Sequence, residues 1–303
     1  MKSFSVTKII GISLLGLLVL ISLGEPILLG QDGNKQNLNA ILQSPSAQHF
    51  LGTDHYGRDM LARVSEGLRI SLSLAALCVF SSSIMGVAAG VIAAWCKGWV
   101  DTLLNYTANT LLALPGLVLV LLFAAIVPGS FIMLYLAISI VLAVEYFRLV
   151  RASTLSIIDS PALECSMLMG FGKGYLFKTH IWPTIKKDVL SLAAFGASTS
   201  IIAMASVGFV YVGLKPPSPE LGLMIVELFP YYHEAPWLLA QPIATLFTLV
   251  LGFQLLVINE DSSRNPLHSH WRAAPALANT FAHTGAESPI NKSPTSKTPE
   301  SNA

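Results

Sequence analysis

The sequence predicts an all-α membrane protein with six transmembrane helices. Of its 303 residues, 53% are hydrophobic and 12% are charged, and the mean hydropathy is +0.63. About a quarter of the residues are charged in a soluble domain, so lipid is expected to replace water around much of this chain. Six apolar runs reach the length of about 20 residues that a helix needs to cross a bilayer.

The predicted spans follow one another between residues 9 and 258. The first exceeds the roughly 7–15 residues of a signal-peptide core and no small-residue cleavage site follows it, so we predict a retained helix. Gly86, Gly90, Pro115 and Gly116 lie inside two of the spans and allow close helix approach or a kink. The spans cover residues 9–29, 70–95, 103–127, 131–150, 189–212 and 237–258.

Four parts are expected along the chain. Residues 1–30 hold a short start and the first span, residues 31–69 form an outer loop, and residues 70–258 form a core of five spans with an inner loop at 159–187. Residues 259–303 are rich in Ser, Pro, Asn and Thr, a composition typical of a disordered tail.

The loop charges predict the orientation of the spans. Lys and Arg favour cytoplasmic loops, and they favour one side here, while carboxylates favour the other. This bias predicts that both termini and the 159–187 loop are cytoplasmic. The inner basic residues are Lys2, Lys8, Lys97, Arg148, Arg151, Lys173, Lys178, Lys186 and Lys187, and the outer ones are Lys35, Arg58, Arg63, Arg69 and Lys215.

The inner loop between the fourth and fifth spans is a candidate partner-binding site. Asp159-Ser160-Pro161 predicts a helix start, with an N-cap and a proline in the first turn. Glu164 lies in that first turn, where it complements the helix dipole. Gly170 and Gly172 then end the helix. A helix–turn–helix that presents small and apolar side chains to a partner is predicted, and an ordinary amphipathic loop is the alternative.

Two outer segments carry further patterns. The first predicts a tight turn whose carboxylates cap a helix or pair with Arg58, with cation or substrate binding by Asp54, His55 and Asp59 as the alternative. In the second, prolines predict a stiff, extended connection that caps the outer side, with a polyproline ligand as the alternative. The turn comprises Gly52, Thr53, Asp54, Gly57, Arg58 and Asp59, and the cap comprises Pro216, Pro217, Pro219, Glu220 and Gly222.

Glu145 is an ionisable residue inside the fourth span. Because carboxylates are costly in a membrane, it is a candidate for substrate binding or gating. A local ion pair with Arg148, one helical turn away, is the alternative. Cys78, Cys96 and Cys165 form neither a disulfide framework nor a CxxC pair, and no metal site is predicted.

Taken in order, these motifs resemble the permeases of bacterial ATP-binding-cassette importers for oligopeptides, dipeptides and nickel, in particular the second of their two paired permeases. The segment from Glu164 through Gly170 to Pro183 is similar to the family's Glu-Ala-Ala coupling motif. The resemblance covers about residues 9–258. The other matching segments are Leu51-Gly52-Thr53-Asp54 with Gly57-Arg58-Asp59, Leu112-Ala113-Leu114-Pro115, Arg148 with Arg151, and the run from Pro216 to Gly222 with Ala235-Pro236-Trp237.

The resemblance implies a type I importer permease fold and uptake across the inner membrane by alternating access. Di- or oligopeptides are the expected substrate, and nickel, metal chelates or cationic peptides are the alternative. The implied partners are a homologous permease in a heterodimer, two ATP-binding subunits that hold ATP and Mg, and a periplasmic or lipid-anchored binding protein. Nucleic acid is not expected as a partner. The chain would be a transport subunit with no cofactor of its own.

The resemblance also implies roles in the coupling loop. Glu164 would orient the coupling helix and Gly170 would permit its sharp exit, while Met167, Leu168 and Phe171 would supply apolar contact with an ATP-binding subunit. The implied coupling residues are Glu164, Cys165, Ser166, Met167, Leu168, Gly170, Phe171, Ile181 and Pro183.

The chain departs from the family pattern at several positions, and the family's closing segment is not recognisable after Gln254. A secondary transporter is a weaker interpretation because no internal repeat is evident. A membrane enzyme is weaker still because the seven histidines are dispersed. The departures are Cys165 and Ser166 in place of alanines, Trp182 in place of leucine, Asn109 in place of aspartate, and Leu221 in place of tryptophan.

Overall fold

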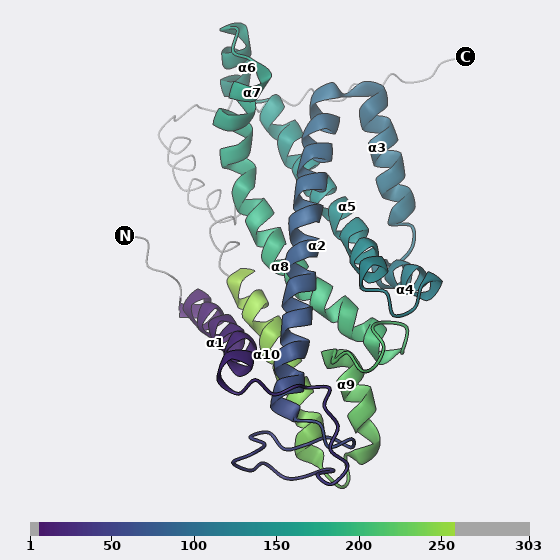
Figure 1. The fold of residues 1–303 in the computed structure, drawn as a ribbon. Coiled ribbons are helices and arrows are strands. Elements are labelled where there is room, and N and C mark those ends of the chain that lie inside the picture. Colours follow the sequence, from purple (N-terminus) through teal and green to yellow (C-terminus); the bar gives the residue numbers. More distant parts are fainter. Residues whose placement is uncertain (1–5, 258–303) are drawn as a thin grey trace, which may run out of the picture. The chain divides into compact units, whose positions relative to one another are not determined.

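A computed structural model describes residues 6–257 of the chain, and the predicted disordered tail lies outside them. Every regular element in the described part is a helix (Figure 1). The elements are α1 (Val6–Leu28), α2 (Met60–Cys96), α3 (Gly98–Leu111), α4 (Gly116–Ile126), α5 (Phe131–Ile158), α6 (Pro161–Leu168), α7 (Lys173–Leu176), the π-helix η1 (Phe177–Ile181), α8 (Trp182–Phe209), α9 (Leu221–Leu228), the 3-10 helix η2 (Phe229–Tyr231) and α10 (Pro236–Val257).

Five helical runs within residues 6–257 are long and apolar enough to cross a membrane: α1, α2, α5, the run from α7 through α8, and α10. The third predicted span is instead broken into α3 and α4, which meet at 79° and give a sixth span if they are counted together. Pro115 explains the break, because proline has no N–H to donate and disfavours helical backbone at the residue before it.

Several helices extend beyond the apolar runs that predict them. The prediction of an outer loop over residues 31–69 is wrong for residues 60–69, because α2 already begins at Met60. Asp59 starts the helix there by accepting a hydrogen bond from the Ala62 N–H at 2.9 Å. With 37 residues, α2 would be about 55 Å long at 1.5 Å per residue. That exceeds the roughly 30 Å of hydrocarbon, so its charged first turns are expected to lie outside it.

The long helices pack through small residues. A Cβ on Gly86 of α2 would lie 2.3 Å from the Tyr146 Cβ of α5, so the two backbones approach too closely for any side chain. Similarly, α1 meets α10 where a Cβ on Gly11 would lie 2.9 Å from the Gly252 carbonyl oxygen. Small residues at helix contacts are typical of membrane proteins, where dispersion contacts drive packing.

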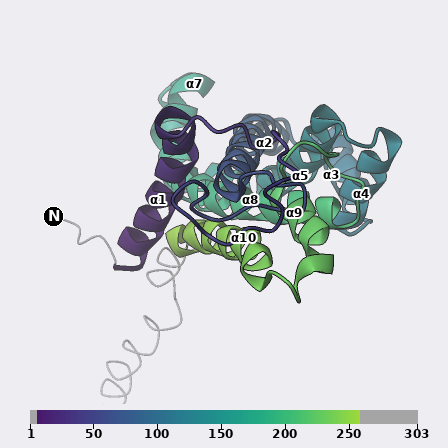
Figure 2. The same ribbon diagram turned by 60° about the horizontal axis from the view of Figure 1, so that its bottom comes forward.

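The predicted inner and outer segments lie at opposite ends of these helices. In Figure 1, α6 and α7 extend past one end of α2, while the loop between α1 and α2 lies with α9 at the other end. Figure 2 views the loop end and shows α1 and the α3–α4 pair on opposite sides of α2. Two distinct candidate sites therefore stand at the two ends of one helical body.

Candidate functional sites

The inner loop forms the predicted helix–turn–helix. Helix α6 begins at Pro161, and Glu164 lies in its first turn. Ser160 is the N-cap residue, as predicted, but its hydroxyl donates back to the Ile157 carbonyl at 2.6 Å and makes no hydrogen bond to the first turn of α6. At the other end Gly170 has a φ of +82°, a left-handed conformation that glycine adopts without steric cost. Its N–H bonds the Met167 carbonyl at 2.9 Å and closes the helix.

The tip of this loop exposes an apolar surface. Leu168 is 83% exposed and Met169 is 67% exposed, and beside them Phe171 stacks on Tyr175 at 4.4 Å between ring centroids. We call Met167, Leu168, Met169 and Phe171 the tip surface. Such large apolar side chains exposed together are typical of a protein interface.

The other predicted coupling residues divide into exposed and buried ones. Glu164, Cys165 and Pro183 are exposed, whereas Ser166 and Ile181 are buried. Ile181 packs in a cluster with Leu163 that holds α6 against the base of α8. The buried residues thus support the loop, and the exposed ones are available to a partner.

A hydrogen bond that sequence reasoning missed fixes α6 to η1. Ser166 Oγ lies 3.0 Å from the Ala162 carbonyl and 2.9 Å from His180 Nε2. The hydroxyl has a single proton, which it donates to the carbonyl, so it accepts from a protonated His180 Nε2. The replacement of a family alanine by Ser166 was the signal that could have pointed to His180.

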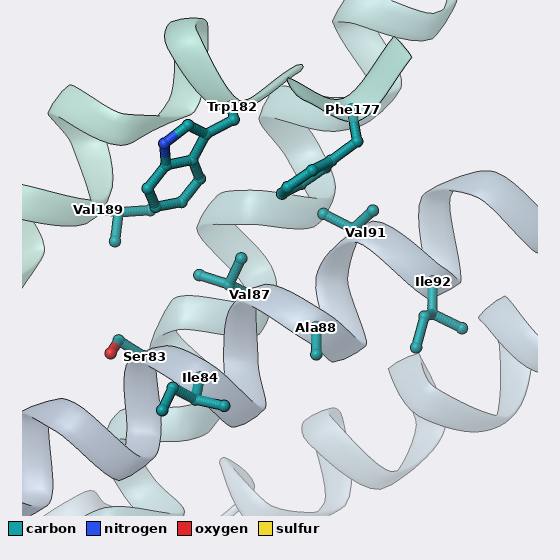
Figure 3. A pocket seen from close by; sticks show the side chains of 9 residues that line it. All are labelled: Ser83, Ile84, Val87, Ala88, Val91, Ile92, Phe177, Trp182 and Val189. Atoms are coloured by element: carbon teal, nitrogen blue, oxygen red, sulfur yellow. The ribbon is translucent and has the colours of Figure 1, made fainter. Parts of the chain in front are cut away.

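An apolar pocket of about 470 Å³ adjoins the base of the loop, between α2 and the start of α8 (Figure 3). Phe177 and Trp182 lie on one side of it, across from Val87 and Val91 of α2. Trp182, a departure from the family leucine, therefore contributes its ring to this pocket. The contact places the loop base directly against a long helix.

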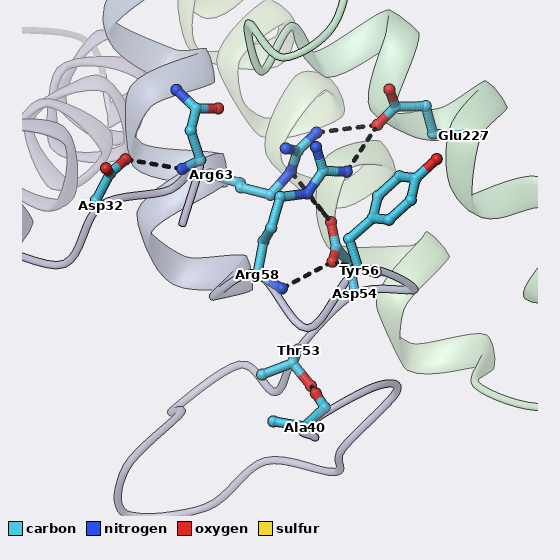
Figure 4. A network of polar contacts seen from close by, with 9 residues as sticks. Asp32, Ala40, Thr53, Asp54, Tyr56, Arg58, Arg63 and Glu227 are labelled. Carbon is cyan, nitrogen blue, oxygen red and sulfur yellow. Dashed lines mark hydrogen bonds and ion pairs between the residues drawn. The ribbon is translucent and has the colours of Figure 1, made fainter. Parts of the chain in front are cut away.

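The outer turn is held by a buried ion-pair network (Figure 4). Asp54 accepts from Arg58 Nε at 2.6 Å and from the N–H groups of Tyr56 and Arg58 at 2.8 and 2.9 Å. Glu227, at the end of α9, accepts from Arg63 at 2.9 Å and from Arg58 at 3.4 Å. Both arginine side chains are 2% exposed. Sequence reasoning missed Arg63 and Glu227, although Glu227 is the one acid in the apolar α9 segment.

The remaining turn residues have structural contacts. Asp59 caps α2 and pairs with His49 at 2.8 Å, and Thr53 donates to the Ala40 carbonyl. Gly57 is required because a Cβ there would lie 1.8 Å from the Asn37 carbonyl oxygen.

The ring of His55 in the same turn stacks on the ring of Tyr231, and burial lowers the pKa of His55. Gly52, the other glycine of the turn, also has a positive φ, of +81°. Both predicted roles of the turn carboxylates, helix capping and pairing with Arg58, therefore occur together.

The proline segment turns instead of extending. Ser218 N–H bonds the Lys215 carbonyl at 3.2 Å across Pro216 and Pro217, so the predicted extended connection is wrong: prolines are equally compatible with a turn. The chain then enters α9 at Glu220, which is 1% exposed. Its carboxylate accepts from the N–H groups of Gly222 and Leu223 at 2.8 and 2.7 Å. Pro219 is buried beside it.

Glu145 lines a second pocket, of about 210 Å³, between α4, α5 and α8. The alternative of a local ion pair with Arg148 is wrong. Arg148 donates to Asn109 Oδ1 of α3 at 2.9 Å, and Glu145 Oε2 is buried without a hydrogen-bond partner. Asn109, which replaces a family aspartate, thus keeps an acceptor for this arginine. Arg151 also reaches α3, in a bidentate pair with Asp101.

Comparison with known proteins identifies the family. Residues 86–260 match the family described as binding-protein-dependent transport system inner membrane component. The dipeptide transport system permease protein DppC of Haemophilus influenzae is 32% identical over 82% of this chain and 86% of its own. DppC of Alkalihalophilus pseudofirmus is 30% identical over 82% of each chain. The glutathione transport system permease protein GsiD of Pectobacterium atrosepticum is 30% identical over 79% of this chain and 80% of its own.

The family match covers more than half of the chain, and the relatives align over most of their own length. The all-helical fold and its membrane-length helices agree with these matches. The chain therefore belongs to the binding-protein-dependent inner-membrane permeases, as a multi-pass, DppC-like subunit of an ATP-binding-cassette importer.

Proposed function

We propose that this chain is the permease subunit that passes di- or oligopeptides inward across the membrane, driven by separate ATP-binding subunits. The observation that carries the proposal is the tip surface. Four large apolar side chains are exposed at the end of the short helix α6 and in the turn that follows it, between α5 and α8. A partner that grips this helix could pull on both long helices at once, which is the rigid lever that alternating access needs.

The partners follow from the same proposal. Two ATP-binding subunits hold ATP and Mg, and one of them binds α6 as the coupling helix. A homologous permease completes the pathway as a heterodimer, and a binding protein delivers substrate to the end that carries the ion-pair network. Both termini are then cytoplasmic, on the same side as α6. Glu164, exposed in the first turn of α6, complements the helix dipole from there.

Peptide is preferred as the substrate because several relatives are named dipeptide, di/tripeptide or glutathione permeases. The nickel alternative comes from the family resemblance, and the outer-loop histidines His49 and His55 are where a nickel ligand would be sought. His49 pairs with Asp59 and His55 stacks on Tyr231, so the two rings make separate contacts. No observation in the described residues favours nickel over peptide.

Reconstitution of the chain with its partner subunits in liposomes tests the proposal. We expect ATP-dependent accumulation of labelled dialanine that requires the binding protein. Leu168→Glu should abolish accumulation by placing a charge on the tip surface, whereas Ser156→Glu introduces the same charge on an exposed residue of α5 that lies outside both the tip surface and the predicted span 131–150. Accumulation of Ni²⁺ without dialanine, or equal transport by Leu168→Glu and wild type, would contradict the proposal.

A further inference from the structure

The pocket beside Glu145 presents hydrogen-bond acceptors and a single charge. Its polar lining residues are Glu145 from α5 and Thr199 and Ser206 from α8. The rest of the lining is formed mainly by aliphatic side chains, among them Val120, Ile138 and Ile202. Specific hydrogen bonds or ion pairs with a ligand in this pocket can therefore come only from the side chains of these three polar residues.

The charge of Glu145 is not matched by a cation in the described residues. Its nearest basic neighbour on α5, Arg148, donates to Asn109, and Arg151 pairs with Asp101. Glu145 Oε2 is buried with no hydrogen-bond partner. Burying a carboxylate is costly unless it is paired or hydrogen-bonded. A cationic ligand would supply the missing partner.

The two hydroxyls can act as acceptors toward the pocket. Thr199 Oγ1 donates to the Phe195 carbonyl at 2.9 Å, and Ser206 Oγ donates to the Ile202 carbonyl at 2.7 Å. Each hydroxyl has one proton, which is used within α8, and keeps lone pairs to accept. A carboxylate and two accepting hydroxyls suit an ammonium group, which has three N–H donors and no acceptor.

A metal ion fits this pocket less well. Divalent cations such as Ca²⁺ and Mg²⁺ require about six or more oxygen ligands in a polar cage, and here one carboxylate faces aliphatic side chains. At about 210 Å³ the pocket is also smaller than the roughly 300–1,000 Å³ of sites that enclose a whole small ligand. It can therefore hold one end of a peptide with a small first side chain.

We propose that this pocket binds the α-ammonium end of the transported peptide, with Glu145 as its counter-ion. The proposal rests on the proposed function and adds a recognition site within the membrane part of this chain. A lysine side chain has the same ammonium chemistry, so the experiment must distinguish the two sources.

The test measures equilibrium binding to the complete transporter in lipid nanodiscs, without the binding protein, by calorimetry. The probes are dialanine, N-acetyl-dialanine, an N-acetylated lysine amide, and Ni²⁺. Wild type should bind dialanine most tightly. Glu145→Gln should weaken dialanine binding roughly tenfold or more, as expected for a lost charged hydrogen bond. Glu145→Asp should retain part of the affinity, and Glu234→Gln, at an exposed outer carboxylate, should retain all of it.

Three results would overturn the inference: equal binding of dialanine and N-acetyl-dialanine by wild type, unchanged dialanine binding by Glu145→Gln, or preference for the lysine amide or Ni²⁺. The first comparison needs no variant, so it decides the matter even if Glu145→Gln does not assemble. ATP-dependent dialanine uptake by the same wild-type preparation, with binding protein added, separates the two proposals. If uptake persists, the inference fails alone, and if wild type shows no uptake, the proposed function fails.

Discussion

Ser166 Oγ lies 2.9 Å from His180 Nε2, and this contact joins α6 to the π-helix η1 before α8. It fixes the tip surface to a long helix at a point where the backbone is irregular. Because a neutral hydrogen bond contributes about 1 kcal/mol, its loss should loosen α6 without unfolding the chain.

Ser166→Ala should therefore speed amide exchange in residues 161–168 by roughly fivefold, as expected for about 1 kcal/mol of local stability. Exchange is measured by mass spectrometry in nanodiscs. Ser156→Ala is the matched control, because that exposed hydroxyl donates only within its own helix, to the Ser153 carbonyl. His180→Ala should give the same change, and the double variant should add nothing further. Additive losses would contradict a direct Ser166–His180 coupling.

Gly170→Ala should weaken the association of ATP-binding subunits, whereas Gly172→Ala should not. An added Cβ meets no atom within 4 Å at either position, so the two substitutions differ mainly in backbone conformation. Gly170 has a φ of +82° and Gly172 a φ of −69°. A left-handed residue with a Cβ costs about 1–2 kcal/mol. Co-purification of the ATP-binding subunits measures the effect, and equal yields from the two variants would refute this account of the turn.

Glu227→Gln should destabilise the outer end of the molecule strongly. Its carboxylate accepts from Arg63 and Arg58, and both arginines are 2% exposed. Removing one partner of a buried ion pair leaves uncompensated charge and costs about 3 kcal/mol or more. Thermal unfolding in nanodiscs should show a clearly lower Tm than wild type. Glu234→Gln removes an exposed acid seven residues further on and should change the Tm little. A similar fall of the Tm in both variants would show that the buried ion pairs of Glu227 do not stabilise the outer end.

Glu220 should make stability depend on pH. Burial raises the pKa of Glu220 to about 7, from an ordinary value of 4.5. The folded state therefore binds this proton more tightly than the unfolded state. The stabilising contribution is fully present below about pH 4.5 and is lost as pH rises through 7. A shift of this size corresponds to about 3 kcal/mol.

Glu220→Gln tests this dependence because glutamine does not ionise. The variant should unfold more easily than wild type near pH 5, since an amide nitrogen cannot accept from the Leu223 N–H. Its unfolding temperature should nevertheless change less than that of wild type between pH 4.5 and 7. Glu234→Gln should keep the wild-type slope. Parallel pH profiles of wild type and Glu220→Gln would show that another group is responsible.

The sequence predicted most of the fold because membrane helices depend on local composition. Apolar length located five continuous spans and the broken third one, and Pro161, Gly170 and Gly172 correctly marked the ends of the inner helices. The helix ends were less predictable. Residues 60–69 are polar enough to look like a loop, but in the helix Arg69 pairs with the distant Glu25 and Arg63 with the distant Glu227.

The sites were predicted less completely for the same reason. Arg58 and Asp54 are four residues apart and their pairing could be anticipated, but the partnership of Arg63 with Glu227 spans 164 residues. Which side chain Arg148 contacts likewise depends on how α3 packs against α5. The spacing of one helical turn favoured an ion pair with Glu145, but the packing of α3 places Asn109 within hydrogen-bond distance of Arg148 instead.

Gly86 should be the glycine of α2 that least tolerates a side chain. An added Cβ would lie 2.3 Å from Tyr146 Cβ and 2.7 Å from the Ala143 carbonyl oxygen, neither of which can move without shifting α5. At Gly90 the nearest atoms are 3.0 Å away, and at Gly16 of α1 no atom lies within 4 Å. Overpacking typically costs about 1–3 kcal/mol, so Gly86→Ala should lower the Tm most, Gly90→Ala less, and Gly16→Ala least. Because all three changes add one methyl group to a helix, differences in helix propensity cancel, and a different order of Tm values would show that the α2–α5 contact is looser than the structure requires.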